Sequence, residues 1–423
     1  MSKKYFFWII VLILAVVYIT KNNTMPTYAP DRDFIDIEDQ LVEQFIFSRD
    51  SSVIELPAGH FLLSQSLRID RKSHLTIRGQ GMEETVLSFK GQTSGAEGIK
   101  ITNSSNIILE DFSVEDAAGD NLKVSETDNL TIRRIRSAWT GRASVENGAY
   151  GIYPVLCNNV ILEENEAIGA SDAGIYVGQS NHVIIRNNKA YYKVAGIESE
   201  NSSHVEIYGN ESFENTSGLL VFNLPGLTTY GNHVNVYNNI IHDNNLPNFA
   251  VKGSIVSATP LGTGIIILAT KDVSVHDNTV KDHKTLNLAI VSYYMFSQEN
   301  QEVSDENQQE LLERGIQPIL PDAGIDPNYN PYPGDIEIKN NSFSNRFLLP
   351  TFSNEFGLLW VLKNKLRIPD IAYDGILADG GSLQDENHLI CINESDDVNF
   401  VFLDGENDLD GFSNDIGQFK CSL

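Results

Sequence analysis

The chain has 423 residues, of which 41% are hydrophobic, and its formal net charge is −27. So large an excess of acidic side chains repels nucleic-acid phosphates and anionic membrane surfaces, which excludes nucleic acid as a partner. The charge is concentrated late in the chain, because residues 301–423 contain 23 acidic and 7 basic side chains, a difference of −16. A chain of this length can bury a large hydrophobic core in one or two domains.

The N-terminus has the pattern of an export signal. Lys3 and Lys4 precede an uncharged apolar run over residues 5–19, and Lys21 follows it. At ~1.5 Å per helical residue the run covers about 22 Å, which is less than the ~30 Å hydrocarbon layer of a membrane. Residues 1–24 are therefore predicted to be either a cleaved signal peptide or an uncleaved inner-membrane anchor, and the rest of the protein is expected to be periplasmic or secreted.

Residues 25–50 are predicted to form an N-terminal linker and cap, with a short amphipathic helix over residues 37–47. A cap is expected because the open end of a stack of strands exposes unpaired backbone and core side chains.

One short pattern recurs between residues 150 and 212. In each copy a Gly-Ile pair is followed, eight residues after the glycine, by a polar residue that begins an alternating apolar run. We call this polar residue the anchor position. Along the chain it is occupied by Asn106, Asn129, Asn159, His182, His204, His233, Asp272 and Asp335. The closest anchors are 22 or 23 residues apart, and a fixed period of this size is typical of a solenoid.

Within each period the predicted strands are short, rich in Ile and Val, and apolar at alternate positions, which favours parallel strands stacked from coil to coil. We predict an all-β, single-stranded parallel β-helix over residues 51–345, with about 22–23 residues per coil. Insertions are expected at 138–149, 245–262 and 292–334, with a helix at 305–314. Residues 346–423 are predicted to form a small acidic C-terminal cap with a helix at 355–366.

Six residues after six of the anchors stands an asparagine. These residues are Asn165, Asn188, Asn210, Asn239, Asn278 and Asn341. Asparagine tolerates left-handed turns and can hydrogen-bond from one coil to the next, so the pattern predicts a structural asparagine ladder. The anchor histidines should stack about 4.8 Å apart, which allows either a metal site or a simple preference for turn-forming polar residues.

The acidic tail contains two further candidate sites. Cys391 and Cys421 lie 30 residues apart, and export would permit a disulfide between them, with two free thiols as the alternative. Glu406, Asp408 and Asp410 alternate before a glycine, a weak resemblance to a calcium-binding loop, with a solvated acidic turn as the alternative. Apart from this Ca²⁺ candidate, no metal or cofactor site is predicted.

The outward-facing side chains of the Gly-Ile strands form the candidate functional face, which is expected to be exposed. From coil to coil they are Lys100 and Thr102, Lys123 and Ser125, Tyr153 and Val155, Tyr176 and Gly178, Glu198 and Glu200, Leu220 and Phe222, and Ile266 and Leu268. The face therefore changes from cationic through aromatic and acidic to apolar. Stacked tyrosines suit sugar rings, and Lys123 with Arg142 can pair with a uronate carboxylate, so the face is predicted to bind a polysaccharide. The alternative is a polar sheet face whose apolar end is covered by the insertions at 245–262 and 292–334.

The Gly-Ile and Asn-Val-x-Ile-x-x-Asn coils resemble the right-handed parallel β-helix repeats of pectate-lyase-like proteins, mannuronan C5-epimerases and periplasmic copper-accessory proteins of nitrous oxide reductase maturation. The whole layout, including the cysteine-bearing tail, is similar to a family of exported bacterial β-helix repeat proteins with no assigned activity, often paired with a second exported protein. The resemblance implies a right-handed coil and a role with carbohydrate.

Mannuronan epimerases carry Tyr-Gly-x-Asp-Pro-His, and this chain has Tyr-Gly-Ile-Tyr-Pro-Val over residues 150–155. Tyr153 and Val155 replace the Asp and His of the motif, so the resemblance implies a degraded epimerase site that lacks a proton carrier. A further epimerase Asp corresponds to Asp172. The candidate catalytic residues are Tyr150, Tyr153, Asp172, Tyr176, Glu198 and Glu200, and the candidate substrate-binding residues are Lys123 and Arg142. The tyrosines with these cations would suit a lyase, and the carboxylates would suit a glycosidase.

Two functions follow from the sequence. The first is an exported protein that binds, and can modify, a polysaccharide. The second is a non-catalytic accessory protein that docks another exported protein, such as a cytochrome or a metal-maturation protein, through its insertions and acidic tail.

Overall fold

The structure is a computed structural model that describes residues 25–297, 326–378 and 389–421, together with 309, 311, 313–316, 318–320, 324 and 383. The predicted export signal at 1–24 lies outside the described residues, as does most of the helix predicted at 305–314. Among the described residues, none of the helices combines the length and apolar character needed to span a membrane.

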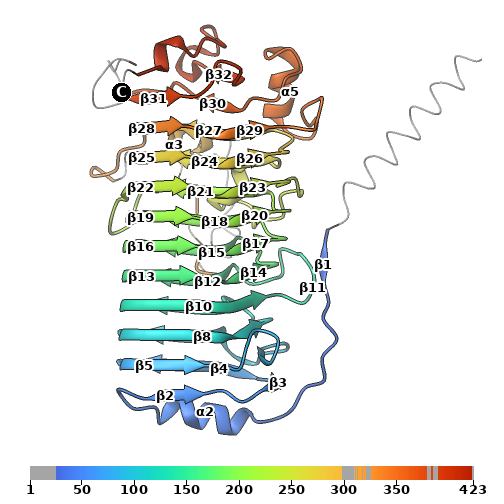
Figure 1. Cartoon of the computed structure of the whole chain (residues 1–423), viewed down its shortest axis with the longest axis vertical. Helices are drawn as coiled ribbons and strands as arrows, with labels where there is room; N and C mark the ends of the chain where they lie inside the picture. Colours follow the sequence, from blue (N-terminus) through green and yellow to red (C-terminus); the bar gives the residue numbers. More distant parts are fainter. Residues whose placement is uncertain are drawn as a thin grey trace, which may run out of the picture.

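The chain winds in successive coils whose strands form three stacks (Figure 1). The first stack contains β2 (Val53–Glu55), β5 (Ser73–Arg78), β8 (Ser105–Glu115), β10 (Asp128–Ala138), β13 (Asn158–Glu163), β16 (Asn181–Arg186), β19 (Ser203–Tyr208), β22 (Asn232–Tyr237), β25 (Lys271–His276), β28 (Gly334–Lys339) and β31 (Ile390–Asn393). The second stack contains β3 (Gly59–Leu62), β6 (Thr85–Ser88), the ends of β8 and β10, β14 (Glu166–Ile168), β17 (Lys189–Tyr191), β20 (Glu211–Phe213), β23 (Ile240–His242), β26 (Thr279–Lys281) and β29 (Ser342–Ser344). The third stack contains β4 (Gln65–Asp70), β7 (Ser94–Thr102), β9 (Leu122–Ser125), β12 (Tyr150–Val155), β15 (Ala173–Gly178), β18 (Ala195–Glu200), β21 (Ser217–Phe222), β24 (Thr263–Leu268), β27 (Leu286–Val291), β30 (Ile371–Tyr373) and β32 (Phe400–Phe402).

Neighbouring strands within each stack pair in parallel, at the period that the sequence predicts. Tyr150 lies opposite Ala173, and Ala173 lies opposite Ala195. The predicted parallel β-helix is therefore confirmed.

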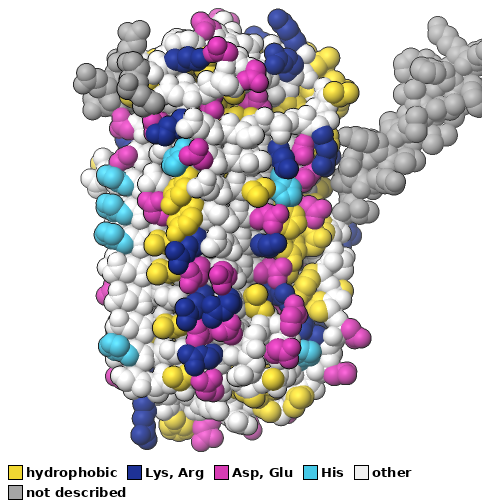
Figure 2. All heavy atoms as spheres, viewed as in Figure 1, with side chains coloured by type: hydrophobic (Ala, Val, Ile, Leu, Met, Phe, Trp, Pro, Cys, Tyr) yellow, Lys and Arg dark blue, Asp and Glu magenta, His cyan; other side chains and the backbone are white. Residues whose placement is uncertain are grey.

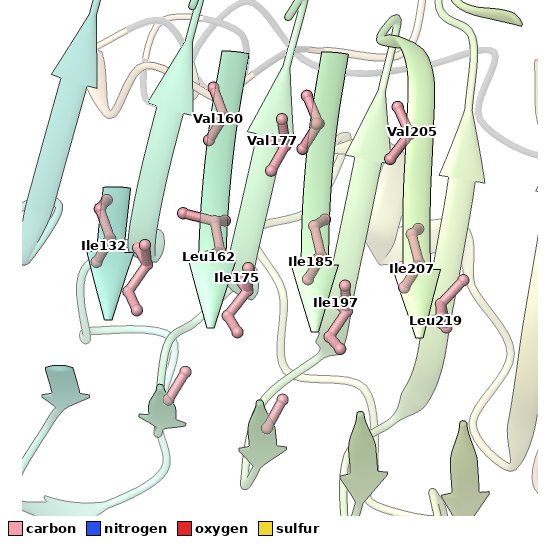
Figure 3. Packing of buried hydrophobic residues seen from close by; sticks show 14 of the residues in the cluster. Ile132, Val160, Leu162, Ile175, Val177, Ile185, Ile197, Val205, Ile207 and Leu219 are labelled. Atoms are coloured by element: carbon pink, nitrogen blue, oxygen red, sulfur yellow. The ribbon is translucent and has the colours of Figure 1, made fainter. Parts of the chain in front are cut away.

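The core fills the interior of the coils with one layer of Ile, Val and Leu side chains per coil (Figure 3). Ile175, Ile185 and Ile197 are fully buried, and each contributes roughly 1.5–3 kcal/mol by leaving water. Because every coil stacks on the next, the core is continuous along the axis.

The backbone explains the residue types at the anchor position. All eight anchors have positive φ, with values such as 55° at Asn159 and His182 and 54° at His204. Asn, His and Asp are the residues that most readily adopt this left-handed geometry, which accounts for the pattern without a metal.

The asparagine ladder is confirmed, but the reason that the sequence suggested for it is only partly right. The Asn188 Nδ2 donates to the Leu162 carbonyl and to Asn210 Oδ1, both at 2.9 Å, and its Oδ1 accepts from Asn165. The left-handed backbone belongs to the preceding residue, with φ of 56° at Asn187, and not to the ladder asparagines themselves. The ladder is therefore selected by buried hydrogen bonding rather than by turn geometry.

A second ladder, which sequence reasoning missed, lies at the turn between the second and third stacks. The Asn215 Nδ2 donates to Asn244 Oδ1 at 2.9 Å, and Asn244 Nδ2 lies 3.1 Å from His283 Nε2. All three side chains are fully buried. Only two asparagines and a histidine share the position, so the pattern was too short to be recognised as a repeat in the sequence.

The N-terminal cap is confirmed and has an additional part. Helix α2 (Glu38–Ile46) closes the first coil with Leu41 and Phe45. Before it, β1 (Thr27–Tyr28) runs along the flank of the molecule and pairs antiparallel with β11 (Gly141–Arg142), inside the predicted insertion at 138–149 (Figure 1).

The C-terminal region is more than a cap. Strands β30, β31 and β32 pair in parallel with the stacks, so the β-helix extends beyond the predicted limit at residue 345. Helix α5 (Glu355–Leu362) is shorter than predicted. Cys391 and Cys421 form the predicted disulfide, with Cα atoms 5.6 Å apart, and Phe419 beside it packs on Phe400. The remaining short helices are η1 (Ile255–Ala258), α3 (Tyr293–Ser297), η4 (Gly405–Asn407) and η5 (Gly417–Phe419).

Candidate functional site

The outer face of the third stack carries the side chains that the sequence placed there. Lys123 lies opposite Tyr153, Tyr176 opposite Glu198, and Glu198 opposite Leu220. The register of the predicted face is therefore correct, and its order from cationic through aromatic and acidic to apolar is present.

Three tyrosines come together in the middle of this face. The ring centroids of Tyr150, Tyr153 and Tyr176 are 4.5–4.8 Å apart, and the Tyr153 and Tyr176 rings meet edge to face. Edge-to-face contact is a favoured geometry for aromatic rings. The three rings form one compact group, which we call the tyrosine cluster.

Tyr176 connects the tyrosine cluster to the carboxylates. Its hydroxyl donates to Glu200 Oε1 at 2.6 Å, and both side chains are buried. Gly178 makes this bond possible, because a Cβ at that position would lie 2.6 Å from the Tyr176 hydroxyl. The glycine therefore gives the tyrosine ring room to lie along the sheet toward Glu200.

Asp172, Glu198 and Glu200 form a buried carboxylate group next to the tyrosines. Burial raises the pKa of Glu200 to about 7, although the bond from Tyr176 opposes the shift. Burial and the neighbouring carboxylates raise the pKa of Asp172 and of Glu198 well above the usual range. Glu198 Oε2 has no hydrogen-bond partner among the described residues. Protons are therefore retained in this group near neutral pH.

A cationic edge adjoins the tyrosine cluster. The Lys123 ammonium lies 4.4 Å from the centroid of the Tyr153 ring and 3.5 Å from an Asp120 carboxylate oxygen. Asp120 also accepts the backbone N–H of Tyr150 at 3.2 Å, and burial raises its pKa to about 6. Sequence reasoning missed Asp120, whose only signal was its place three residues before Lys123.

The expectation that this face is exposed is wrong from Tyr153 onward. Tyr176 is 4% exposed, Glu198 1% and Glu200 3%. Among the described residues of the predicted insertion at 292–334, Leu311, Ile316 and Ile319 pack in the same hydrophobic cluster as the three tyrosines. The Ile319 N–H donates to the Gly253 carbonyl at 2.9 Å, and the Tyr329 hydroxyl donates to the Asn223 carbonyl at 2.8 Å. The predicted cover over the apolar end is present, and burial continues as far as the tyrosine cluster.

Arg314 connects the predicted insertion at 292–334, which covers this face, to the coils that carry the tyrosine cluster. Its Nη2 donates to the carbonyls of Val145 and Asn147 at 2.8 and 2.9 Å and to Ser171 Oγ at 3.0 Å. Its charge also opposes the rise in the pKa of Asp172. Sequence reasoning missed this residue, although it is the only basic side chain in the insertion.

The other sequence candidates lie elsewhere. Arg142 is exposed on β11 beside the N-terminal segment, and within the described residues it has no ion pair or hydrogen bond to the tyrosine cluster. Glu406, Asp408 and Asp410 are exposed in the tail. In the part of the chain that the structure describes, no three His, Cys, Asp or Glu side chains are placed to hold a metal ion. Calcium binding therefore stays an untested expectation.

Comparison with known proteins agrees with the fold. Residues 139–347 match the model of a right handed beta helix region. No curated protein matches the chain. Among solved structures, the A-module of the mannuronan C-5 epimerase AlgE4 of Azotobacter vinelandii aligns over 87% of this chain and 93% of its own length, at 14% identity and a TM-score of 0.51. The AlgE6 A-module of the same organism aligns over 82% and 88%, at 14% identity and a TM-score of 0.48. The chain therefore has the fold of a right-handed parallel β-helix.

Proposed function

We propose that the chain is an exported protein that binds a polysaccharide on the outer face of the third stack and modifies it at the tyrosine cluster. The observation that carries the proposal is the 2.6 Å bond between Tyr176 and Glu200 within a group of buried, partly protonated carboxyls. A carboxyl group with a pKa of about 7 can both donate and accept a proton near neutral pH. Lyases, epimerases and glycosidases all need such proton transfer.

A polysaccharide can reach this site only from the part of the face that is still exposed to solvent. Lys100 and Lys123 are 33% and 22% exposed at their side chains, whereas Leu220 and Ile266 beyond the carboxylates are buried. A sugar chain would therefore enter from the cationic edge and reach Tyr153 first. A uronate carboxylate would pair with Lys123 there.

The test is a panel of alginate, pectin and neutral polysaccharides, with binding, unsaturated products and new reducing ends as readouts. Glu200→Gln and Tyr176→Phe are each expected to lower turnover at least about a hundredfold, as is usual when a general acid or base is removed. Glu126→Gln, on an exposed turn, is the matched control. Absence of both binding and product across the panel would sink the proposal.

A second candidate function is docking of another exported protein, and an exposed apolar surface near α5 favours it. Six large apolar side chains lie open to solvent between residues 348 and 366. They are Leu348, Leu349, Phe352, Leu358, Leu362 and Leu366, with exposures from 43% to 93%. Grouped exposed apolar residues are typical of interaction sites. Leu362→Glu should abolish co-purification of a partner, whereas Ile240→Glu, at an exposed position on β23, should not. A protein that captures no partner would count against this function.

A further inference from the structure

A long groove runs along the outer face of the first stack, on a different sheet from the tyrosine cluster. It crosses the coils from β5 to β22 and has a volume of about 930 Å³. Its floor is half-buried and consists of Thr76, Ile108, Thr131, Ile161, Ile184, Glu206 and Asn235. Its wall is the row of anchor residues His74, Asn106, Asn129, Asn159, His182, His204 and His233, which are exposed except for the half-buried Asn106. Figure 2 views this face and shows histidines in a line along one edge.

The groove is almost free of charge, although the chain as a whole carries −27. Glu206 is the one carboxylate among its lining residues, and it accepts a bond from Asn235 Nδ2 at 2.8 Å. The next outward-facing row on the same strands is charged, and its acidic and basic side chains pair with one another. Arg133 lies 2.6 Å from Glu110, and Arg186 lies 2.5 Å from Glu163. The groove therefore offers little to an ionic ligand of either sign.

The wall repeats the same hydrogen-bonding groups at every coil. The Asn159 Nδ2 donates to Asn129 Oδ1 at 3.1 Å, a bond that uses one of the two donors on the Asn159 amide. Farther along, the ring centroids of His182, His204 and His233 are 4.8 and 4.9 Å apart. The His204 Nδ1 lies 2.9 Å from Asn181 Oδ1, and the two His233 nitrogens lie 2.5 Å from Asn232 Oδ1 and 3.0 Å from Asp272 Oδ2. The His182 ring and the His204 Nε2 are therefore the imidazole groups that the wall offers to a ligand. The wall is thus a line of polar groups spaced by one coil.

We propose that this groove is a second binding site and that its ligand is an uncharged polysaccharide lying along the helix axis. Sugar hydroxyls both donate and accept hydrogen bonds, as the amides and imidazoles of the wall require. The half-buried side chains of Ile108, Ile161 and Ile184 give the apolar faces of sugar rings a surface to contact. An anionic chain would be repelled by the charge of the molecule, and a basic peptide would find only Glu206, which is already bonded.

The proposal is independent of the tyrosine cluster, because the two surfaces lie on different sheets. Glu200→Gln and Tyr176→Phe should leave binding in the groove unchanged. A protein that binds neutral glycans but yields no product would support the groove and contradict catalysis.

The experiment is titration of the full chain with neutral soluble glucans, mannans and galactans, at low salt and at 0.5 M salt. Binding should be the same at both salt concentrations, because no ion pairs are involved. His182→Gly together with His204→Gly should weaken it at least about tenfold, since two sets of hydrogen bonds are lost. Glycine accepts the positive φ at these positions, so the backbone is preserved.

Asp335→Gly is the matched control, because Asp335 is an exposed anchor with φ of 52° that does not line the groove. It should leave the affinity unchanged. Ile184→Lys, which fills the floor without touching the turns, should also weaken binding. The proposal is overturned if no neutral glycan binds, if binding falls with salt, or if the two groove variants bind like the Asp335→Gly control.

Discussion

Glu200 combines a cost for folding with the proton-transfer role that we propose for it. The side chain is 3% exposed, and its pKa is raised to about 7 from the ordinary value of 4.5. A difference of this size corresponds to on the order of 3 kcal/mol between the folded and the unfolded chain. The protein therefore keeps a poorly solvated acid beside Tyr176, an arrangement frequent at active sites.

This cost predicts a pH dependence of stability. Between about pH 4.5 and 7 the unfolded chain binds fewer protons at Glu200 than the folded one. The contribution of Glu200 to the free energy of unfolding should therefore fall as the pH rises through this range and level off above it. Asp120, Asp172 and Glu198 contribute falls of the same sign, so Glu200→Gln should make the total fall shallower in denaturant titrations at several pH values, whereas Glu126→Gln should not. An unchanged profile in Glu200→Gln would refute the assignment.

The ladder asparagines predict large losses from single substitutions. Asn188→Ala would leave the Leu162 carbonyl and the donors of Asn165 without their partners inside the core. A buried polar group without a partner costs about 1–3 kcal/mol, so we expect a loss of about 3 kcal/mol or more in thermal or chemical unfolding. Asn187→Gly, at the exposed positive-φ neighbour, should change stability by less than about 0.5 kcal/mol. Equal effects of the two variants would contradict this account.

At the scale of elements, the predicted insertion at 292–334 determines which side chains of the candidate site are buried. The sequence predicted the order of side chains on the third stack, because residues two apart in a strand share a face. It could not predict their burial, because the cover returns from more than a hundred residues later. Arg314 reaches Val145 and Asn147 through backbone carbonyls, which every residue has, so no pattern in the sequence marks the contact.

Arg314→Ala should loosen the cover. Each hydrogen bond from a charged donor contributes about 1.5 kcal/mol or more, so losing these bonds should make exposure of the tyrosine cluster at least about tenfold more frequent. The readout is the rate of chemical nitration at Tyr150, Tyr153 and Tyr176, measured by peptide mass spectrometry. Arg346→Ala, which removes ion pairs to Asp243 and Asp282, is the control and should leave that rate unchanged.

The C-terminal coil should depend on its disulfide. Replacing both Cys391 and Cys421 by Ser removes a link that closes a loop of 30 residues, worth roughly 3–4 kcal/mol in the chain-entropy model. Hydrogen exchange should accelerate in β31 and β32, while β15 and β16 keep their protection because they lie many coils away. Uniform acceleration along the whole β-helix would contradict this local effect.

At the scale of the whole molecule, a period of 22 or 23 residues was enough to predict the fold, because each coil repeats the same pattern of strands and turns. The end of the β-helix was not predictable in the same way. Strands β30 and β32 have three residues each and lack the Gly-Ile pattern, so only the pairing of β30 with β27 and of β32 with β30 reveals them. A coil can be predicted from the sequence when it repeats the pattern of its neighbours, and the irregular coils at the C-terminal end do not repeat it.

The N-terminal segment from β1 to Arg32, which lies along the flank of the molecule, alters how this stack would bear force. A simple solenoid transmits load from each coil to the next, beginning at its first coil. Here β1 is paired with β11, and Arg32 forms a 2.8 Å ion pair with Glu115 that is buried on both sides. A pull applied at Met25 would therefore be taken up by β11 and β8 in the body of the stack, and α2 would carry load only after those contacts had ruptured.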